Sequence, residues 1–425
     1  MLRRRRKPFR IAWPGVLLLL IFALALFLRL HFLTVAGPRT LTHDELGYDT
    51  TAVQLLEKGV LGYNYGNPAV PTGAPNAFVT PGYPLFLAAV YKVHGLLAPG
   101  TSPLPSVQFV QAILSLGVVG LVFLLGSRLG GYPAGLIAAC CAAIYPPFIW
   151  ANCRILTEPL FTLFFTGYVY LVQVSRERHG QEPAPVRYGA TGFLLGLSAL
   201  IRPTVAPLLA VAPLGLPRGL RSRFFLATLC GFLLALLPWV VRNYVDFHAF
   251  IPFATQTGNP FLRGTDPYDP YDRYGPSVIK DVPPEQQFRV GLERIRHGLE
   301  TEPRRWVAWF TVGKLSWLWL KPWGGMPYMQ EIANALHRLL VAGGVLGMVF
   351  ALRHPPLRWP AAVVATMTAI QLAFIPLNRY VFPLMPALIV LAAWSATHAA
   401  TLAFRGFGRV HGYFCGCRKR VDRRE

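Results

Sequence analysis

The chain has 425 residues, of which 53% are hydrophobic and only 14% charged, and its formal net charge is +22 at pH 7. Soluble domains carry about 25% charged residues, so this composition excludes an ordinary soluble protein and indicates a membrane protein. The positive charge does not indicate a nucleic-acid partner, because Arg and Lys concentrate in the tails and in short loops between apolar runs, as on the cytoplasmic side of membrane proteins. We therefore expect membrane lipids with anionic headgroups, and no nucleic acid, at the basic side.

Apolar runs of roughly 20 residues, the length that crosses a hydrocarbon core of about 30 Å, recur along the chain. The first follows RRRRK and is too long for the apolar core of a signal peptide, so we interpret it as a retained anchor. Ten spans are expected, at 11–36, 105–127, 132–152, 155–175, 188–201, 203–217, 223–243, 332–352, 358–377 and 381–403. An even number returns both termini to one side, and their basic residues predict that this side is the cytoplasm.

Two further apolar segments are not expected to cross. The segment 84–97 is too short, and 304–323 is rich in Trp and interrupted by Lys314. Aromatic and basic amphipathic helices prefer the membrane interface. Both would lie in two outer loops, about 37–104 and 244–331, which hold most of the acidic residues.

The sequence thus predicts one domain over 1–425, an all-α polytopic membrane protein with about ten transmembrane helices and interfacial helices on its outer face. A basic cytoplasmic tail is expected over 404–425.

The first outer loop begins with THDEL, which places Asp44 and Glu45 shortly after the first span. Thr42 and Glu45 fit a capping box, in which the glutamate reaches back to the start of a helix. Capping explains Glu45 about as well as catalysis does, but it leaves Asp44 unexplained. A carboxylate held there is suited to accept a proton from a sugar hydroxyl as a general base.

Several arginines lie within or at the ends of spans. A charge at the bilayer centre costs about 2.5–3.5 kcal/mol, so ionisable residues inside the membrane usually have an ion-pair partner or a function. Arg154 and Glu158 are four residues apart on one expected helix, where they can form an ion pair with each other. Arg202 has no acid nearby in sequence. Arg242 and Arg379 each end a span on the outer side, where extension toward water is the simplest explanation. The alternative is that these arginines together bind a lipid phosphate.

The second outer loop contains DPYDPYDRYG at 266–275. Its Asp and Tyr residues suit a cation or a sugar ring, but it lacks EF-hand spacing, and such residues also build ordinary turns. No metal ligands and no certain cofactor are predicted, although a divalent cation remains possible.

The order of several segments resembles the integral-membrane glycosyltransferases of the GT-C type, near family 39 and the aminoarabinose-transferase-like group. The segments run through nearly the whole chain: DELGYDTTAVQLL, PGYPLFLAAVYKVHG, RILTEPLFTLFF, GLSALIRPT, LPWVVRNY and NRYVFPLMPALIVLAA. The resemblance implies an enzyme that takes a sugar from a polyprenyl-phosphate donor and passes it to an acceptor on the outer face. It also implies catalysis by the acidic residue after the first span, which here is Asp44 with Glu45 beside it.

We therefore expect an inverting hexosyl- or pentosyltransferase of a bacterial inner membrane, acting on an envelope lipid, glycan or protein. Asp44 would deprotonate the acceptor hydroxyl, and Glu45 would orient it or replace it. The substrate-binding residues are expected to be Tyr83, Arg154, Glu158, Arg202, Arg242, Arg379 and Tyr380. The stretch AFVTPGYP lacks the acid and lysine that close aminoarabinose-type relatives often carry before the proline, so Tyr83 or an arginine would have to replace that donor contact.

Two other functions remain open at this point. A transporter or flippase of a lipid-linked sugar would also have many spans and buried arginines, but it would not need an acidic pair and would more often show an internal repeat. A membrane scaffold without enzymatic activity would use the two acidic outer loops as binding surfaces.

Overall fold

The computed structural model describes residues 13–37, 39–177, 185–256, 258–270, 277–324 and 329–421, with side chains between 15 and 403. Within these ranges the chain is helical and contains no strand. The helices are α1 (Trp13–Ala36), α2 (Asp44–Lys58), α3 (Gly82–Leu97), α4 (Leu104–Ile144), α5 (Pro146–Trp150), η1 (Ala151–Cys153), α6 (Glu158–Glu177), α7 (Pro185–Ala199), η2 (Pro203–Val205), α8 (Leu208–Val211), η3 (Ala212–Gly215), α9 (Arg218–Phe247), α10 (Gly258–Arg263), η4 (Pro284–Gln286), α11 (Gln287–Thr301), α12 (Pro303–Ala308), η5 (Trp309–Gly313), α13 (Lys314–Trp319), α14 (Gln330–Ala351), η6 (Pro355–Leu357), α15 (Arg358–Gln371), η7 (Asn378–Tyr380), η8 (Phe382–Leu384) and α16 (Met385–Val421).

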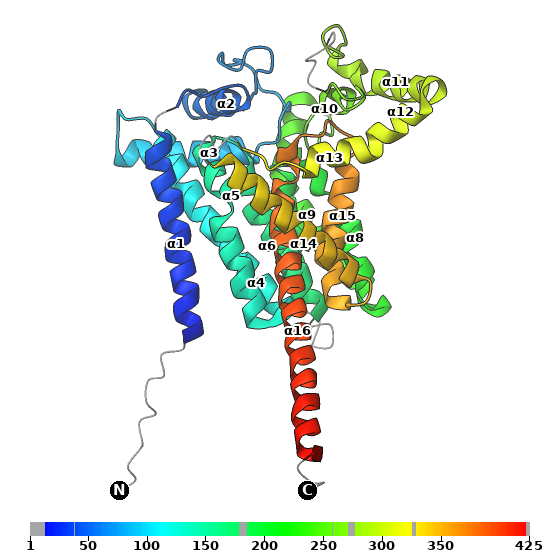
Figure 1. The fold of residues 1–425 in the computed structure, drawn as a ribbon. Coiled ribbons are helices and arrows are strands. Elements are labelled where there is room, and N and C mark those ends of the chain that lie inside the picture. The colour runs from blue at the N-terminus through cyan, green and yellow to red at the C-terminus, as the bar shows by residue number, and fades with distance from the viewer. Residues whose placement is uncertain are drawn as a thin grey trace.

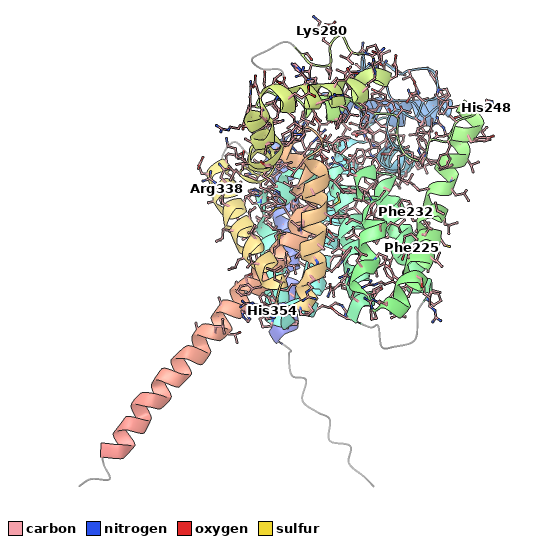
Figure 2. The ribbon with its side chains drawn as sticks, turned by 90° about the vertical axis from the view of Figure 1, so that its right-hand side faces the viewer. Phe225, Phe232, His248, Lys280, Arg338 and His354 are labelled. Carbon is pink, nitrogen blue, oxygen red and sulfur yellow. The ribbon has the colours of Figure 1, made fainter. Side chains whose placement is uncertain are left out.

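The long helices form a bundle with two distinct ends (Figure 1). Helices α2 and α3 lie across one end, and α10 to α13 gather there too; we call this the loop end. At the opposite end, which we call the tail end, α1 begins and α16 continues beyond the bundle. Figure 2 shows Lys280 and His248 at the loop end and His354 at the tail end. The described parts of α1 and α16 therefore point toward the same side, as the sequence predicts for the two termini.

Helix α4 is a hairpin of two limbs, which explains how one assigned helix covers two predicted spans. Gly131 has a φ of 78°, a left-handed conformation that favours glycine, and the chain reverses there. The limbs pack closely, since a Cβ added to Gly126 would lie 3.0 Å from the Cα of Gly135. The first limb matches the expected span 105–127, and the second limb, with α5 and η1, matches 132–152.

Helical segments occupy all of the expected spans, so the predicted all-α membrane architecture is confirmed. By length and composition, five helices of the described chain suffice to cross a membrane: Gly15–Ala36, Leu104–Ile144, Arg218–Phe247, Gln330–Ala351 and Asn378–Ala403. A shorter apolar segment covers Pro203–Gly215. The number of ten spans stays a prediction, because the remaining segments are too short or too polar to be assigned in this way.

A buried arginine ties the first helix to the α4 hairpin. The side chain of Arg29, in α1, is fully buried. Its Nε donates a hydrogen bond to the Ser115 hydroxyl at 2.8 Å, and its Nη1 and Nη2 donate to the carbonyls of Ala143 and Ala142 at 3.0 and 3.4 Å. A second Nη1 bond, to the Ala25 carbonyl at 3.0 Å, stays within α1. Five N–H groups of the guanidinium thus meet four neutral acceptors and no carboxylate.

The two segments expected at the interface are both helical and both lie at the loop end (Figure 1). The segment 84–97 forms most of α3, and 304–323 forms α12, the π-helical turn η5 and α13. Lys314, whose charge interrupts the second segment, is fully buried. Its Nζ donates to the Leu372 carbonyl at 2.7 Å and lies 3.9 Å from the centre of the Phe310 ring. Burial lowers the pKa of Lys314 to about 7.

The buried lysine predicts a pH-dependent stability. The native state releases this proton near pH 7, whereas an unfolded chain holds it up to about pH 10.4. The unfolded state binds more protons within that window, so the free energy of unfolding should rise as the pH increases from 7 to 9. Thermal unfolding of the purified protein in nanodiscs across this range should show the rise, and Lys314→Met should remove it. Replacement of the exposed Lys321 by Met should not, and equal pH slopes for wild type and Lys314→Met would contradict the assignment.

Candidate active site

The start of α2 lies at the loop end and carries the acidic pair. Asp44 and Glu45 occupy its first turn, where carboxylates are favoured by the helix dipole, and Gly59 ends the helix with a φ of 67°. His43, immediately before Asp44, has a φ of 47°, which costs a non-glycine residue of order 1–3 kcal/mol. The chain therefore enters α2 through a strained residue.

Asp44 belongs to a chain of ion pairs drawn from four separate parts of the sequence. Its Oδ2 lies 2.8 Å from Nη2 of Arg379, whose Nε lies 3.9 Å from Oε1 of Glu158. The same Glu158 oxygen accepts a hydrogen bond from Nη2 of Arg202. Arg202 also donates two bonds to the Thr157 hydroxyl, at 2.9 and 2.8 Å. Two carboxylates thus balance two guanidinium groups.

The four charges differ in their access to solvent. The side chain of Glu158 is fully buried, whereas that of Asp44 is 41% exposed. Arg202 and Arg379 are intermediate, at 16% and 25%. Glu158 therefore serves as a buried counter-charge, because a buried carboxylate needs its partners. Asp44 and one side of each guanidinium remain open to an incoming molecule.

A cavity of about 240 Å³ opens at this cluster. Its lining combines aliphatic residues with polar and aromatic ones, and the latter include Asp44, Tyr48, Tyr63, Phe78, Thr80, Thr157, Arg202, Gln256, Gln371, Phe374, Arg379 and Tyr380. The guanidinium carbons of Arg202 and Arg379 lie 5.6 and 5.7 Å from the centre of the Tyr380 ring, within cation–π distance. Four of the predicted site residues, Asp44, Arg202, Arg379 and Tyr380, thus meet in one cavity.

Two tyrosines of the cavity lining lie close enough to Asp44 for its charge to act on their hydroxyls. Burial, and next the charge of Asp44, raise the pKa of Tyr48 above its usual value. The same two causes raise the pKa of Tyr63. Both hydroxyls therefore stay protonated at neutral pH and can donate hydrogen bonds. The two rings meet edge to face, with centroids 5.7 Å apart, so each fixes the other.

The capping box expected at the start of α2 is not formed. The residue that precedes the helix is His43, and no side chain caps the helix there. The Glu45 carboxylate, only 2% exposed, accepts a bond from the backbone N–H of Ile155 at 3.1 Å. The Thr42 hydroxyl donates to Glu45 Oε2 at 3.3 Å, so the two side chains do meet. The Glu45 carboxylate thus bonds the backbone N–H of Ile155, far away in sequence, instead of the backbone N–H at the start of its own helix.

The expected pairing of Arg154 with Glu158 is also wrong. Arg154 has an extended backbone after η1 and α6 begins at Glu158, so the two do not share a helix. Arg154 instead places its Nη2 2.8 Å from Oε2 of Glu45 and lies over the Trp150 ring. Neither Glu45 nor Arg154 lines the cavity. Glu158 does not line it either, but it forms an ion pair with Arg202, which does.

Tyr83 supports the cavity from behind without lining it. Its side chain is buried, and its hydroxyl donates to Oε1 of Gln111 at 3.0 Å. Its ring packs edge to face on Tyr48, with centroids 5.2 Å apart. Tyr83 is thus placed to hold Tyr48 rather than to contact a substrate in this conformation.

Arg242 lies outside the cavity and holds the first outer loop. Its Nη1 and Nη2 donate to the carbonyls of Asn76 and Leu61 at 3.0 and 2.8 Å, and its Nε lies 2.9 Å from Oδ2 of Asp246. The carbonyls belong to the loop that carries Tyr63, so Arg242 affects the cavity through the position of this loop.

Several lining residues were missed by the sequence analysis. Tyr48 carries a usable signal, because it stands four residues after Asp44 and so lies on the same helical face. Thr157 also had one, as the neighbour of Glu158 in RILTEPLF. Tyr63 in a loop and Gln371 at the end of an apolar helix carry no such signal.

Metal ligands do not gather in the described part of the chain, where no group of three or more His, Cys, Asp or Glu side chains is placed to hold an ion. The motif at 266–275 lies partly outside the described residues, since 271–276 are not among them.

No protein-family model and no curated protein sequence matches the chain. Among solved structures, the fold is similar to the apo oligosaccharyltransferase of Archaeoglobus fulgidus, with a TM-score of 0.58 at 14% identity, over 95% of this chain and 53% of that one. The A. fulgidus AglB complex with an inhibitory peptide and a dolichol-phosphate gives 0.58 at 14% identity, over 95% and 52%. ArnT from Cupriavidus metallidurans bound to undecaprenyl phosphate gives 0.46 at 13% identity, over 91% and 60%.

The protein thus spans about half the length of the oligosaccharyltransferase that it matches. The likeness confirms the GT-C type of fold that the sequence resemblance implies. At 14% identity it establishes the architecture alone, so the activity has to be argued from the cavity itself.

Proposed function

We propose that the protein is an inverting membrane glycosyltransferase that takes a sugar from a polyprenyl-phosphate donor. The acceptor would be an envelope lipid, glycan or protein on the outer face of a bacterial inner membrane, with both termini in the cytoplasm. The observation that carries the proposal is one cavity at the loop end that combines a half-exposed carboxylate, Asp44, with two arginines, Arg202 and Arg379. A fold shared with an enzyme solved with dolichol-phosphate supports a lipid-phosphate donor.

The two arginines suit the phosphate of the donor. Guanidinium groups bind phosphate oxygens bidentately, and in this site they already carry compensating carboxylates. Arg202 is committed to Thr157 and Glu158. In the described part of the chain, Nε of Arg379 is buried without a hydrogen-bond partner. Apart from the 3.9 Å approach to Glu158, Arg379 is held by the half-exposed Asp44, so it is the less committed arginine, and we assign it the first contact with the phosphate.

Asp44 would act on the acceptor. Its carboxylate takes the proton of the acceptor hydroxyl while that oxygen bonds to the anomeric carbon from the face opposite the phosphate. The bond between the anomeric carbon and the phosphate oxygen breaks, and the polyprenyl phosphate leaves with the electron pair. Arg379 and Arg202 stabilise the charge that develops on this oxygen.

The ion pair between Asp44 and Arg379 sets the order in which the donor and the acceptor act. Without substrate, Arg379 holds the carboxylate at 2.8 Å. A donor phosphate competes for the same guanidinium and so releases Asp44 toward the acceptor. Binding of the donor would therefore prepare the base before the acceptor reacts.

Glu45 and Arg154 have a different role in this proposal from the one expected from the sequence. Their ion pair and the Ile155 bond join the start of α2 to the segment before α6. They would position Asp44 and Glu158 relative to each other without touching the substrate.

The test is a transfer assay in proteoliposomes. Purified protein is reconstituted with radiolabelled mannosyl, glucosyl, galactosyl and aminoarabinosyl polyprenyl phosphates and with an extract of bacterial envelope lipids and glycans. We expect label from one donor to move to an acceptor of the extract, with release of polyprenyl phosphate. Label that crosses the bilayer but stays on the prenol would show the alternative, a transporter or flippase.

A further inference from the structure

Two buried side-chain oxygens lack a partner in the protein. In the described part of the chain, neither Oδ1 of Asn152 nor the hydroxyl of Thr162 makes a hydrogen bond. Both residues are only 1% exposed. Buried polar groups are almost always hydrogen-bonded, because an unpaired one loses its bonds to water and forms none that offset the loss. Two such oxygens indicate a bound ligand if they border the same space.

Asn152 and Thr162 do line one small cavity. Its volume is about 10 Å³, and its lining is Ser115, Val118, Phe148, Ala151, Asn152, Pro159, Thr162 and Phe382. The three polar members, Ser115, Asn152 and Thr162, carry no charge. A space of about 10–15 Å³ is the smallest that admits one water molecule. The cavity is therefore too small for a phosphate, a sugar or a lipid chain.

The amide of Asn152 is oriented by the backbone beside it. Its Nδ2 donates to the carbonyls of Phe148 and Ile149, at 2.9 and 3.2 Å. An amide oxygen cannot donate to these carbonyls, so the nitrogen and the oxygen of the side chain cannot exchange places. Oδ1 of Asn152 is thus fixed as an acceptor that needs a donor.

Ser115 joins the cavity to the buried Arg29. Its hydroxyl oxygen accepts a hydrogen bond from Nε of Arg29 at 2.8 Å. A serine hydroxyl also has one hydrogen of its own to donate. The cation beside it polarises the hydroxyl and strengthens the bond that this hydrogen forms.

A single water molecule matches these three groups. It can accept the hydrogen of Ser115, donate one hydrogen to Oδ1 of Asn152 and form a third bond with the hydroxyl of Thr162. Buried waters typically make about three hydrogen bonds to polar groups that otherwise lack a partner. A metal ion is a poorer match, because the lining offers it no carboxylate, imidazole or thiolate.

We propose that Ser115, Asn152 and Thr162 bind one structural water molecule. The water joins the first limb of α4, the short helix η1 and the second turn of α6, and Ser115 extends the network to Arg29 in α1. Arg154 follows η1 and Glu158 begins α6, so the water lies between the segments that carry these two residues. The proposal is independent of the proposed function, because it needs neither a donor nor an acceptor.

The direct test is a structure of the whole protein in nanodiscs at about 2 Å resolution, by electron cryo-microscopy with a bound antibody fragment. We expect an ordered peak at about 2.6–3.2 Å from both Oδ1 of Asn152 and the hydroxyl oxygen of Thr162. Unchanged side chains with no peak between them would show that the proposal is wrong.

Thr162→Val tests the water by thermal unfolding in nanodiscs, because it removes the hydroxyl and keeps the shape. With the water bound, the change deletes one of its bonds, so the melting temperature should fall by about 1–3 °C. Without a water, the change only removes an unpaired polar group, and the melting temperature should stay the same or rise.

Thr166→Val is the matched control. Its hydroxyl lies one turn later on α6, is similarly buried and also lacks a partner in the described chain, but Thr166 does not line the cavity. The melting temperature of Thr166→Val should therefore not fall. An equal fall in both variants, or no fall in Thr162→Val, would overturn the proposal.

A double-mutant cycle tests whether Ser115 and Thr162 share the water. We expect Thr162→Val to lower the melting temperature less in a Ser115→Ala background than in wild type, whereas Thr166→Val should act equally in both. Strictly additive effects of Ser115→Ala and Thr162→Val would remove Ser115 from the site. If Ser115→Ala does not fold, because it also breaks the Arg29 bond, the density and the threonine pair decide the question.

Discussion

Replacing Asp44 with Asn is expected to lower sugar transfer by roughly 10²–10⁴-fold, the usual contribution of a general base. The amide has nearly the same volume but cannot take the proton of the acceptor hydroxyl. Because the side chain is 41% exposed, loss of its ion pair with Arg379 should cost little stability. Expression and thermal unfolding should therefore stay close to those of wild type. A water-soluble citronellyl methyl phosphodiester, which measures the phosphate site alone, should bind at least as tightly as to wild type, because the carboxylate no longer competes for Arg379. Single-turnover transfer in proteoliposomes, with donor saturating, measures the effect on the chemical step.

Glu45→Gln is the matched control, because it removes the neighbouring carboxylate. Glu45 is almost fully buried against Arg154 and the Ile155 N–H, so this variant should lose thermal stability. Breaking a buried pair by removing one partner is costly, of order 3–5 kcal/mol when the pair is fully desolvated. Protein that remains folded should still transfer sugar. Wild-type turnover by Asp44→Asn would remove Asp44 from the proposed chemistry. Complete inactivity of folded Glu45→Gln would contradict the purely positioning role assigned to Glu45.

Replacing Arg379 with Lys is expected to raise the KM for the lipid-phosphate sugar, or to lower kcat, by about tenfold or more, which corresponds to ~1.4 kcal/mol. An arginine that only extends toward water could be replaced by lysine with little effect. Arg379 instead bonds Asp44 with one nitrogen while its Nε lacks a hydrogen-bond partner in the described structure. The planar guanidinium fork can hold Asp44 and a phosphate oxygen in turn, and the single ammonium of lysine cannot reproduce this geometry.

Arg242→Lys makes the same chemical change outside the cavity. It breaks the bonds to the carbonyls of Leu61 and Asn76, so it should lower the melting temperature and loosen the loop that bears Tyr63. The affinity for the methyl phosphodiester should change little. If Arg379→Lys binds that diester and transfers sugar normally at limiting donor, the phosphate contact must be sought at Arg202.

The architecture could be predicted because its signals are local. Apolar runs of spanning length, loop charge and the Trp-rich interruption are each visible within a window of one helix. Every expected span contains helix in the described part of the chain. Asp44 was also found locally, from its position after the first span. Local reasoning failed where it assumed that neighbours in sequence are partners in space, as for Arg154 with Glu158 and for the capping box of Glu45.

The actual partners are distant along the chain. Arg202 reaches Glu158 across 44 positions, and the Ile155 N–H reaches Glu45 across 110. Such pairs depend on how helices pack, which composition and periodicity do not determine. Tyr63 and Gln371 illustrate the same limit, because only the folded chain brings a loop tyrosine and the last residue of α15 to one cavity.

The buried Arg29 has a consequence for how the chain is assembled in the membrane. Helix α1 is synthesised and inserted first, and at that moment its arginine has only its own helix to bond, at the Ala25 carbonyl. Its other acceptors, Ser115, Ala142 and Ala143, belong to a hairpin that is translated about a hundred residues later. Until then the charge carries an insertion cost whose upper value is about 2.5–3.5 kcal/mol, the cost at the bilayer centre. Newly inserted α1 is thus an incomplete element that gains its full stability only when the α4 hairpin reaches it, which makes this hairpin the step that commits the first helix to the bundle.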